Sequence, residues 1–383
     1  MTRGPERVIR DEVLAMSAYH VQSAAGMVKL DAMENPYSLP AKLRQALAVS
    51  LAGCELNRYP DPTAPALKAR LRAVMGIPDD FELLLGNGSD ELIQIIIQAC
   101  ARPGAVVMAP VPTFVMYQAY STIAGTRFIG VPLRADFSLD VAAFVGAIRE
   151  HDPAVVFISY PNNPTGNLFA AEDILKIVGA VSGIVVIDEA YQPFAETSWL
   201  GRLQDSSNVV LLRTMSKLGL AGIRLGYATG RKEWIGEFDK VRSPYNVNVL
   251  TQCVAETILA DSSILEEQAA EIRASRGVLL RRLAQVAGVS PFPSAANFVL
   301  ARVPNAPAVF AGLRARGILV KNLHGMHPLV DNCLRITVGT PAENELFLTA
   351  FSSAIADLPD GAARRDRVGL PRVAPRSQKP VST

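Results

Sequence analysis

Lys217 is the lysine whose sequence surroundings best suit covalent amine chemistry. It follows the apolar run Val209–Leu212 and the turn Arg213–Ser216, and it precedes the glycine-rich segment Leu218–Gly226. A lysine at the end of a buried strand, beside glycines that let other atoms approach, can act as a nucleophile because desolvation lowers the pKa of its amine. Taken alone, this feature favours an ordinary loop lysine.

A glycine turn, Gly86–Glu91, lies between the apolar run Phe81–Leu85 and an apolar helical pattern that begins at Leu92. Free backbone N–H groups and the positive end of the helix dipole make such a turn an anion site, to which Ser89 adds a hydroxyl. The turn is not a P-loop, because no Gly-Lys-Ser/Thr follows, and its last position does not fit a dinucleotide fingerprint. A plain capped turn with Ser89 as the N-cap is the alternative.

Two further apolar runs end in polar side chains. Asp188 ends the run Ile184–Ile187 at the edge where open α/β sheets bind ligands. A carboxylate there is costly to desolvate unless a cation, such as a protonated pyridine nitrogen, pairs with it. A capping or Walker-B aspartate is the alternative, although the latter lacks a P-loop. Asn163 lies in the turn Tyr160–Gly166, where Asn-Pro and Thr-Gly favour tight turning.

These features end separate strands at one edge of one sheet. They supply an anion site, a carboxylate, an amide and an amine. Pyridoxal phosphate (PLP) needs such groups for its phosphate, ring nitrogen, ring oxygen and aldehyde. The sequence therefore predicts a PLP site with Lys217 as the covalent attachment point, whereas a structural α/β domain without cofactor would make the convergence a coincidence.

The elements that must position these residues alternate between short apolar runs and helical patterns, which is typical of a three-layer α/β/α domain with a mostly parallel sheet. The predicted strands are Phe81–Leu85, Ala105–Ala109, Arg127–Leu133, Ala154–Ser159, Ile184–Ile187, Val209–Leu212 and Arg224–Ala228. The predicted helices between them are Ser89–Ala101, Phe114–Gly125, Leu139–Glu150 and Ala171–Val181.

After Pro244 the pattern favours a smaller α+β domain. Its predicted helices are Val249–Ala260, Ile264–Val286, Ala308–Arg316 and one that begins after Thr340, with Pro341 at its first position and Glu343 completing a capping box. Its predicted strands are Phe298–Val303, Ile318–Val320 and Leu334–Val338. The helix Ile264–Val286 is expected to link the two domains.

The predicted organisation has an N-terminal arm that is also part of the small domain (residues 1–45), a large PLP-binding domain (46–248), a small C-terminal domain (249–358) and a disordered tail (359–383). No strand is expected in the first 35 residues. The tail is rich in Pro, Arg and Ser, and its hydrophobic periodicity is weak.

Composition excludes several functional classes. The 38 basic and 36 acidic residues leave a net charge of +2, which argues against nucleic-acid binding through bulk electrostatics. The four cysteines form no CxxC pair, so we expect reduced thiols in a cytoplasmic protein. Neither a secretory signal nor a membrane span is expected. His324 and His327 could form a metal pair, but no further ligand accompanies them, so we interpret them as loop residues and predict no metal.

The chain resembles the class I/II, fold-type I PLP-dependent aminotransferases, and within them the histidinol-phosphate aminotransferases, over about residues 13 to 357. The motifs that carry the resemblance are, in order, KLDAMENPY (29–37), NRYPD (57–61), GNGSDE (86–91), PNNPTG (161–166), DEAY (188–191), RTMSK (213–217) and CLRITVGT (333–340). Each motif is modest alone, whereas all of them in this order are specific.

The resemblance implies amino-group transfer between histidinol phosphate and 2-oxoglutarate, with glutamate as a product, in a PLP-dependent, cytoplasmic homodimer that serves histidine biosynthesis. It implies that Lys217 binds the cofactor covalently and moves the substrate proton, that Asp188 pairs with the ring nitrogen, and that Asn163 and Tyr191 bond the ring oxygen. The implied phosphate ligands are Ser89, the backbone N–H of Asp90, Thr214, Ser216 and Arg224.

The remaining implied roles concern the ring and the substrate. Phe114 would stack on the cofactor ring, and Tyr59 would reach across the dimer interface to the partner's cofactor. Arg335 would bind the anionic group of the substrate, with Tyr19, Asn87 and Lys321 nearby.

The chain departs from the family pattern at three places. Phe114 replaces a more usual tyrosine, seven rather than eight positions separate Lys217 from Arg224, and Lys321 stands where relatives often carry arginine. Lysine keeps the charge but loses the bidentate fork that suits phosphate. An aromatic aminotransferase and a threonine-phosphate decarboxylase remain alternatives with the same cofactor. A non-catalytic PLP-binding regulator has little room for a DNA-binding domain before Phe81.

Overall fold

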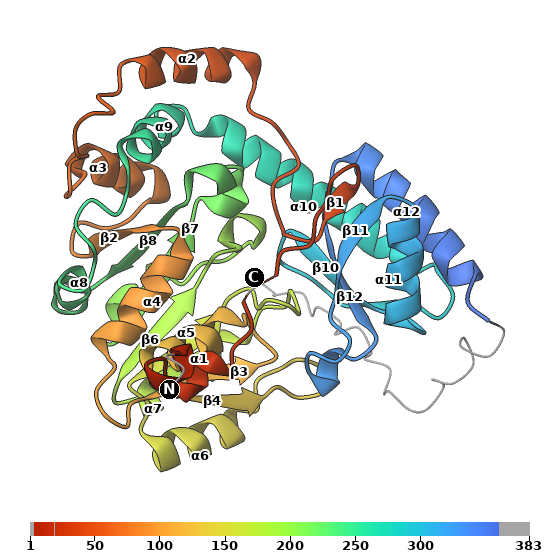
Figure 1. Cartoon of the computed structure of the whole chain (residues 1–383), viewed down its shortest axis with the longest axis horizontal. Helices are drawn as coiled ribbons and strands as arrows, with labels where there is room; N and C mark the ends of the chain where they lie inside the picture. Colours follow the sequence, from red (N-terminus) through yellow and green to blue (C-terminus); the bar gives the residue numbers. More distant parts are fainter. Residues whose placement is uncertain (1–3, 19, 360–383) are drawn as a thin grey trace, which may run out of the picture.

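Two units, each built around one sheet, make up the described part of the chain (Figure 1). The computed structural model describes residues 4–18 and 20–359. Tyr19 and nearly all of the predicted tail lie outside the described residues, so neither prediction can be compared with the structure.

The larger sheet has seven strands in the order β2-β8-β7-β6-β5-β3-β4. Neighbouring strands are parallel except at β8, which is antiparallel to both β2 and β7. The strands are β2 (Glu82–Asn87), β3 (Val106–Val111), β4 (Arg127–Pro132), β5 (Val155–Ser159), β6 (Ile184–Asp188), β7 (Val209–Thr214) and β8 (Leu225–Gly230). Each end lies within two residues of its predicted end, and the predicted fold class is confirmed.

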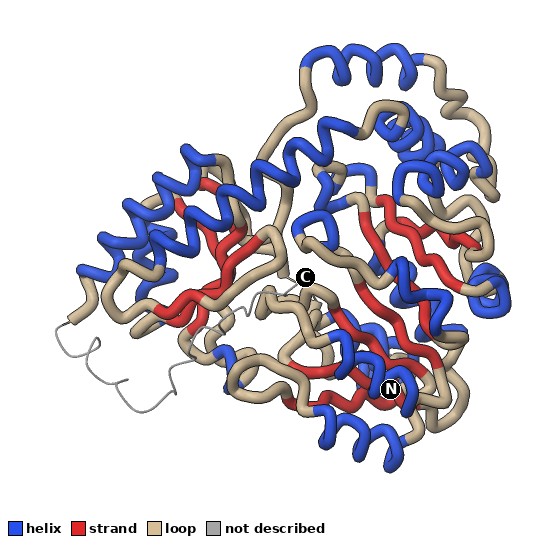
Figure 2. The backbone as a smooth tube through the Cα atoms, turned by 180° about the vertical axis from the view of Figure 1, so that it is seen from behind, coloured by secondary structure: helices blue, strands red, loops and turns tan. Residues whose placement is uncertain are grey.

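Helices cover both faces of this sheet. Successive side chains of a strand point to opposite faces, and in these strands the side chains on both faces are apolar, so both faces need to be buried. In β2, Leu83 and Leu85 belong to one core, whereas Leu84 belongs to the other. The first core is closed by α3 (Pro65–Met75), α6 (Val141–His151), α7 (Ala171–Ala180) and α9 (Val249–Leu259), and the second by α4 (Ser89–Ala99), α5 (Met116–Ala124) and α8 (Lys232–Asp239). Figure 2 shows the layers from behind.

The smaller unit holds a five-stranded sheet in the order β1-β11-β12-β10-β9. Its strands are β1 (Val28–Leu30), β9 (Ser290–Pro291), β10 (Phe298–Arg302), β11 (Ile318–Asn322) and β12 (Cys333–Thr337). Its helices are α10 (Ser263–Leu283), α11 (Ala306–Ala315) and α12 (Pro341–Ala356). The predicted capping box of α12, formed by Thr340 and Glu343, is present. Helix α10 runs from the larger core, where Leu265 is buried, into the smaller core, where Leu279 is buried.

The N-terminal segment departs from prediction. The expectation that the first 35 residues hold no strand was wrong, because β1 pairs in parallel with β11, Val28 opposite Ile318. Three residues are too few to show a strand pattern, and their partner lies far along the chain. The segment also forms α1 (Asp11–Leu14), which packs on α5, and α2 (Ala41–Ala52), which packs on α9.

Helix α9 lies with the larger unit, although the predicted domain boundary precedes it. Its buried residues Ala255, Ile258 and Leu259 belong to the core beneath the larger sheet. Among the described residues, no helix combines the length and apolar character that crossing a bilayer requires.

Candidate active site

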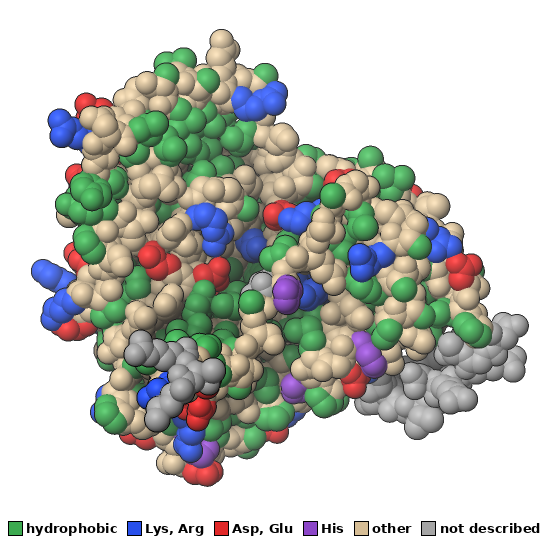
Figure 3. Space-filling view, in the orientation of Figure 1, with side chains coloured by type: hydrophobic (Ala, Val, Ile, Leu, Met, Phe, Trp, Pro, Cys, Tyr) green, Lys and Arg blue, Asp and Glu red, His purple; other side chains and the backbone are tan. Residues whose placement is uncertain are grey.

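A cavity opens at the edge of the larger sheet where β5, β6 and β7 end. The residues that line it are Met33, Ser89, Asp90, Phe114, Ser159, Asn163, Asp188, Ala190, Tyr191, Thr214, Ser216, Lys217 and Arg224. The structure therefore brings together the predicted amine, carboxylate, amide and anion site. Figure 3 shows the surface hollowed between the two units, with charged side chains of both signs along the hollow.

Lys217 lies in the turn that follows β7, in the short helix Ser216–Leu218. Its Nζ donates to the backbone carbonyl of Ala32 at 3.2 Å and lies 5.8 Å from the centroid of the Tyr191 ring. Burial, followed by the positive charge of Arg335, lowers the pKa of the Lys217 amine to about 8. A larger fraction of the amine is therefore neutral, and so nucleophilic, near neutral pH than for a solvated lysine.

Asp188 is the last residue of β6, and only 3% of its surface is exposed. Burial raises the pKa of this carboxyl group to about 6, against the opposing effect of the hydrogen bonds that it accepts. Tyr117 Oη donates to Oδ2 at 2.6 Å, and the Ala190 N–H donates to Oδ1 at 3.0 Å. A buried carboxylate of this kind favours a cationic partner in the cavity.

Asn163 connects the two units. Its Nδ2 donates to the hydroxyl of Tyr191 at 3.1 Å, and its Oδ1 accepts from Arg335 Nη1 at 2.5 Å. Arg335 comes from β12 in the smaller sheet and also donates to the carbonyl of Asp31 at 2.9 Å. The Cα of Lys321 lies opposite that of Arg335, and burial followed by the Arg335 charge lowers the pKa of the Lys321 amine. Both cations therefore come from the smaller sheet.

The opposite end of the cavity is rich in donors. Ser216 Oγ accepts from Arg224 Nη1 at 3.3 Å, and Thr214 Oγ1 donates to the same oxygen at 3.0 Å. Arg224 also pairs with the Asp90 carboxylate at 3.3 Å. Ser89 and Asp90 begin α4, whose N-terminus points its unpaired N–H groups outward. This end combines hydroxyl, guanidinium and backbone N–H donors, and it fits an anion.

Glycines allow this close approach. A side chain at Gly88, whose φ is 83°, would place its Cβ 2.6 Å from the Arg224 guanidinium. A Cβ at Gly226 would lie 2.6 Å from the backbone nitrogen of Ser89. Only glycine leaves room for the strand β8 and the start of α4 to meet here.

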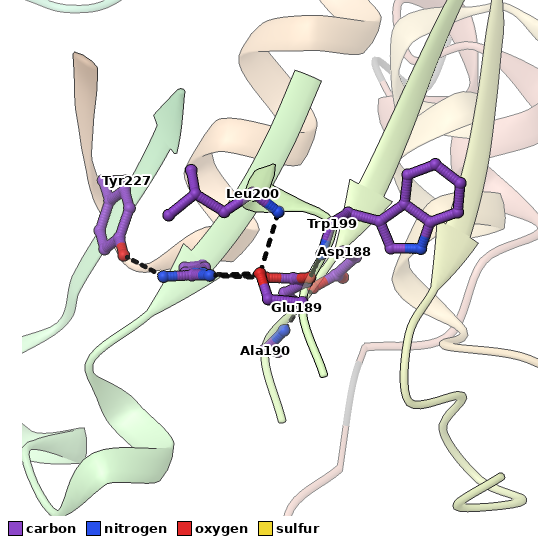
Figure 4. Close-up of polar contacts among 8 residues, drawn as sticks. Asp188, Glu189, Ala190, Trp199, Leu200 and Tyr227 are labelled. Carbon is purple, nitrogen blue, oxygen red and sulfur yellow. Dashed lines mark hydrogen bonds and ion pairs between the residues drawn. The ribbon is translucent and has the colours of Figure 1, made fainter. Parts of the chain in front are cut away.

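A buried ion pair begins at Glu189, the residue that follows Asp188 (Figure 4). The neighbouring residue, Glu189, pairs with Arg213 at 2.8 Å, and it also accepts from the backbone N–H of Trp199 at 2.6 Å. Arg213 donates to the hydroxyls of Ser198 and Tyr227. These contacts tie the loop after β6 to β7, to β8 and to the Ser198–Trp199 segment.

Some predicted residues do not line the cavity. Tyr59 is 80% exposed and stacks on Tyr245 with ring centroids 4.5 Å apart. Asn87 is exposed at the end of β2, and its N–H donates to Glu91. Arg335 and Lys321 are not among the lining residues either, although Arg335 contacts the lining residue Asn163, and Tyr19 lies outside the described residues.

His324 and His327 each accept a backbone N–H on Nδ1, from Asn332 and Leu329 respectively, both at 3.2 Å. In the described part of the chain, no three His, Cys, Asp or Glu side chains are grouped to hold a metal. All four cysteines are free thiols.

Sequence reasoning missed Tyr117. It follows Phe114 by three residues, so both lie on one side of the chain entering α5, and its ring is fully buried. The motif Pro-Thr-Phe-Val-Met-Tyr contains both aromatics, but only the fold brings the Tyr117 hydroxyl to Asp188. The carbonyls of Asp31 and Ala32 were missed as well, because their partners come from distant strands.

Comparison with known proteins identifies the family of the chain and supports the fold. The model of the family "Aminotransferase class I and II" matches residues 25–351. A histidinol-phosphate aminotransferase of Cupriavidus pinatubonensis is 56% identical over 92% of this chain and 98% of its own length. The histidinol-phosphate aminotransferase of Sinorhizobium meliloti, solved in complex with pyridoxal-5'-phosphate, superposes with a TM-score of 0.81 at 26% identity, covering 91% of this chain and 98% of that one.

The fold alone is shared with other activities. The L-threonine-O-3-phosphate decarboxylase of Porphyromonas gingivalis superposes with a TM-score of 0.74 at 21% identity, covering 86% of this chain and all of its own. The fold, the site and the family match together define a PLP-type α/β enzyme architecture. The chain belongs to the aminotransferases of class I and II.

Proposed function

We propose that this chain transfers an amino group from histidinol phosphate to 2-oxoglutarate with PLP as cofactor, as a step of histidine biosynthesis. The observation that carries this proposal is the 56% identity, over 92% of the chain, to a protein named histidinol-phosphate aminotransferase. The family match over residues 25–351 spans both sheets, and therefore the cavity and the positions of Arg335 and Lys321.

The residues of the cavity fit PLP. Asp188 at one end suits a protonated ring nitrogen, and the donors around Ser216 at the other suit a phosphate. Gly88 and Gly226 leave space that a Cβ would fill, and Phe114 provides an aromatic wall. When bound, PLP supplies an aldehyde that captures amines and a ring that accepts electrons.

Each residue then has a defined task. Lys217 Nζ, largely desolvated, attaches the cofactor and afterwards accepts the proton from the substrate carbon that carries the amino group. Asp188 stabilises the ring cation, and Asn163 Nδ2 with the Tyr191 hydroxyl donates to the ring oxygen. The phosphate is held by Ser89, the N–H of Asp90, Thr214, Ser216 and Arg224.

Arg335 and Lys321 bind the anionic group of each substrate. Their proximity, with Cα atoms paired across β11 and β12, gives a site with two positive charges suited to a phosphate monoester. The carboxylate of 2-oxoglutarate uses the same cations in the second half-reaction. Lysine at position 321 contributes charge without the bidentate fork of arginine.

We also propose a homodimer in which Tyr59 reaches the partner's cofactor. Tyr59 and Tyr245 are large aromatic side chains that are exposed yet stacked on each other, which suits an interface. Sedimentation of the purified protein measures the dimer directly.

The decisive experiment records the visible absorption of the PLP-loaded protein during substrate addition. Histidinol phosphate should bleach the cofactor band, 2-oxoglutarate should restore it, and Lys217→Ala should show no covalent cofactor band. Release of carbon dioxide from threonine phosphate, without keto product, would instead establish a decarboxylase. A cofactor band that responds only to aromatic amino acids would show that these, and not histidinol phosphate, are the substrates.

A further inference from the structure

Tyr117 is fixed in place by aromatic packing. It lies on α5 with its side chain fully buried, and its ring stacks on Phe157 of β5 with centroids 4.6 Å apart and planes within 9°. The ring of Phe114 meets it edge-on at 5.6 Å. Packing on both neighbours leaves the ring little freedom, so the hydroxyl is held at one position.

At that position the Tyr117 hydroxyl contacts the carboxylate of Asp188. The Tyr117 hydroxyl donates to Oδ2 at 2.6 Å, a short distance typical of a donor to an ionised acceptor. The Ala190 N–H, visible in Figure 4, donates to Oδ1. Each carboxylate oxygen therefore has one fixed protein donor, and the remaining lone pairs are available to the cavity that Asp188 lines.

The Tyr117 hydroxyl keeps its proton, whereas the Asp188 carboxyl group is ionised. Burial, followed by the nearby Asp188 charge, raises the pKa of Tyr117 well above its ordinary value, so the hydroxyl keeps its proton and donates. Burial also raises the pKa of Asp188, and the hydrogen bond from Tyr117 is the largest effect that opposes this rise. The bond therefore favours the ionised form of a carboxyl group whose environment favours the neutral form.

We infer that Tyr117 is a positioning residue whose hydroxyl keeps Asp188 ionised and oriented, and thereby determines how firmly the ring nitrogen of the cofactor holds its proton. The inference rests on the proposed function, because it requires PLP in the cavity. Loss of the hydroxyl makes Asp188 the stronger base, so the shared proton moves from the ring nitrogen towards the carboxylate. The ring then withdraws electrons less strongly, and the proton transfer at the substrate carbon slows.

The test is Tyr117→Phe, loaded with PLP that is isotope-labelled at the ring nitrogen. Nuclear magnetic resonance should show the nitrogen signal displaced towards the unprotonated position. The kcat should fall about tenfold, the size expected when one hydrogen bond to a charged group is lost, while KM changes little. Tyr227→Phe is the matched control, because it removes another fully buried hydroxyl that does not contact Asp188, and it should leave the nitrogen signal in place.

A double-variant cycle separates positioning from packing. In an Asp188→Asn background, removal of the Tyr117 hydroxyl should produce no further displacement of the nitrogen signal. An unchanged signal in Tyr117→Phe, or the same displacement with asparagine at 188, would overturn the inference. If the variant does not fold, fluorotyrosine at position 117, a more acidic donor with the same ring, should displace the signal in the opposite direction, and no displacement would overturn the inference.

Failure of the proposed function gives a different result. In that case the wild-type protein itself would form no covalent adduct with PLP, or would not respond to histidinol phosphate. An intact wild-type response with an unaffected Tyr117→Phe variant refutes only the role of Tyr117.

Discussion

The two ends of the cavity are built on opposite physical principles. At the Asp188 end, side chains are buried and held by packing, and the neighbouring ion pair of Glu189 and Arg213 is 0% and 8% exposed. At the other end, Arg224 and Asp90 form an ion pair whose side chains are 47% and 39% exposed. The first end is shielded from solvent, whereas the second is polar and partly exposed to solvent, and we therefore treat it as the hydrated end.

This difference indicates a division of work. In a buried site with a low dielectric constant, electrostatic interactions are strong and an unpaired polar group costs much free energy. Such a site suits the control of protonation at one atom. A hydrated site of donors gives binding energy that depends on salt and tolerates small shifts, which suits the capture of a phosphate. We therefore expect changes at the first end to affect stability and chemistry, and changes at the second to affect cofactor affinity.

The largest effect is expected for the buried ion pair. Glu189→Gln leaves the Arg213 charge without its partner, so the free energy of unfolding should fall by about 3 kcal/mol. The matched control is Glu345→Gln, which breaks an exposed pair with Arg282 whose side chains are 59% and 45% exposed. That change should cost less than about 1 kcal/mol. Urea unfolding measures both, and equal losses would contradict the contrast between buried and exposed pairs.

A smaller effect is expected at the hydrated end. Arg224→Gln should weaken PLP binding about tenfold, because one charge-assisted bond to the phosphate is lost, and kcat at saturating PLP should change little. Titration of the apo protein at low and high ionic strength measures the dissociation constant. Binding to the wild type should weaken as salt rises, and the variant should lose part of that sensitivity. A large drop in kcat with unchanged affinity would contradict the proposed division.

The smallest effect is expected for Lys217, between the two ends. With a pKa of about 8, its amine is mostly protonated at pH 7, and the reactive neutral form increases as pH rises through 8. Arg335→Gln removes a cation that lowers this pKa, so the pKa should rise, and covalent attachment of PLP at pH 7 should slow about threefold.

The pH dependence provides the control for this prediction. Well above the pKa the amine is neutral in both proteins, so the wild-type and variant rates should converge at pH 10. A slowing that persists equally at every pH would show that Arg335 acts by a route other than the charge of Lys217.

Local patterns determined most of the fold. The larger sheet follows from apolar runs bounded by turns, since a strand buried on both faces needs apolar side chains at successive positions, as in Val209–Leu212. The start of α12 follows from Thr340, Pro341 and Glu343, whose capping contacts lie within one helical turn. The candidate site residues could be chosen because polar side chains directly after such runs must meet at one sheet edge.

Tertiary structure decided what depends on distant partners. Val28–Leu30 forms a strand because it pairs with the edge of β11, which lies almost 300 residues later in the chain. Helix α9 joined the larger core through contacts with α2 and α3 that its own amphipathic pattern does not specify. The bonds from Tyr117 to Asp188 and from Arg335 to Asn163 join residues 71 and 172 positions apart. Residue type and periodicity predict which side chains are buried. Which atoms of distant residues form hydrogen bonds depends on how whole helices and strands pack together.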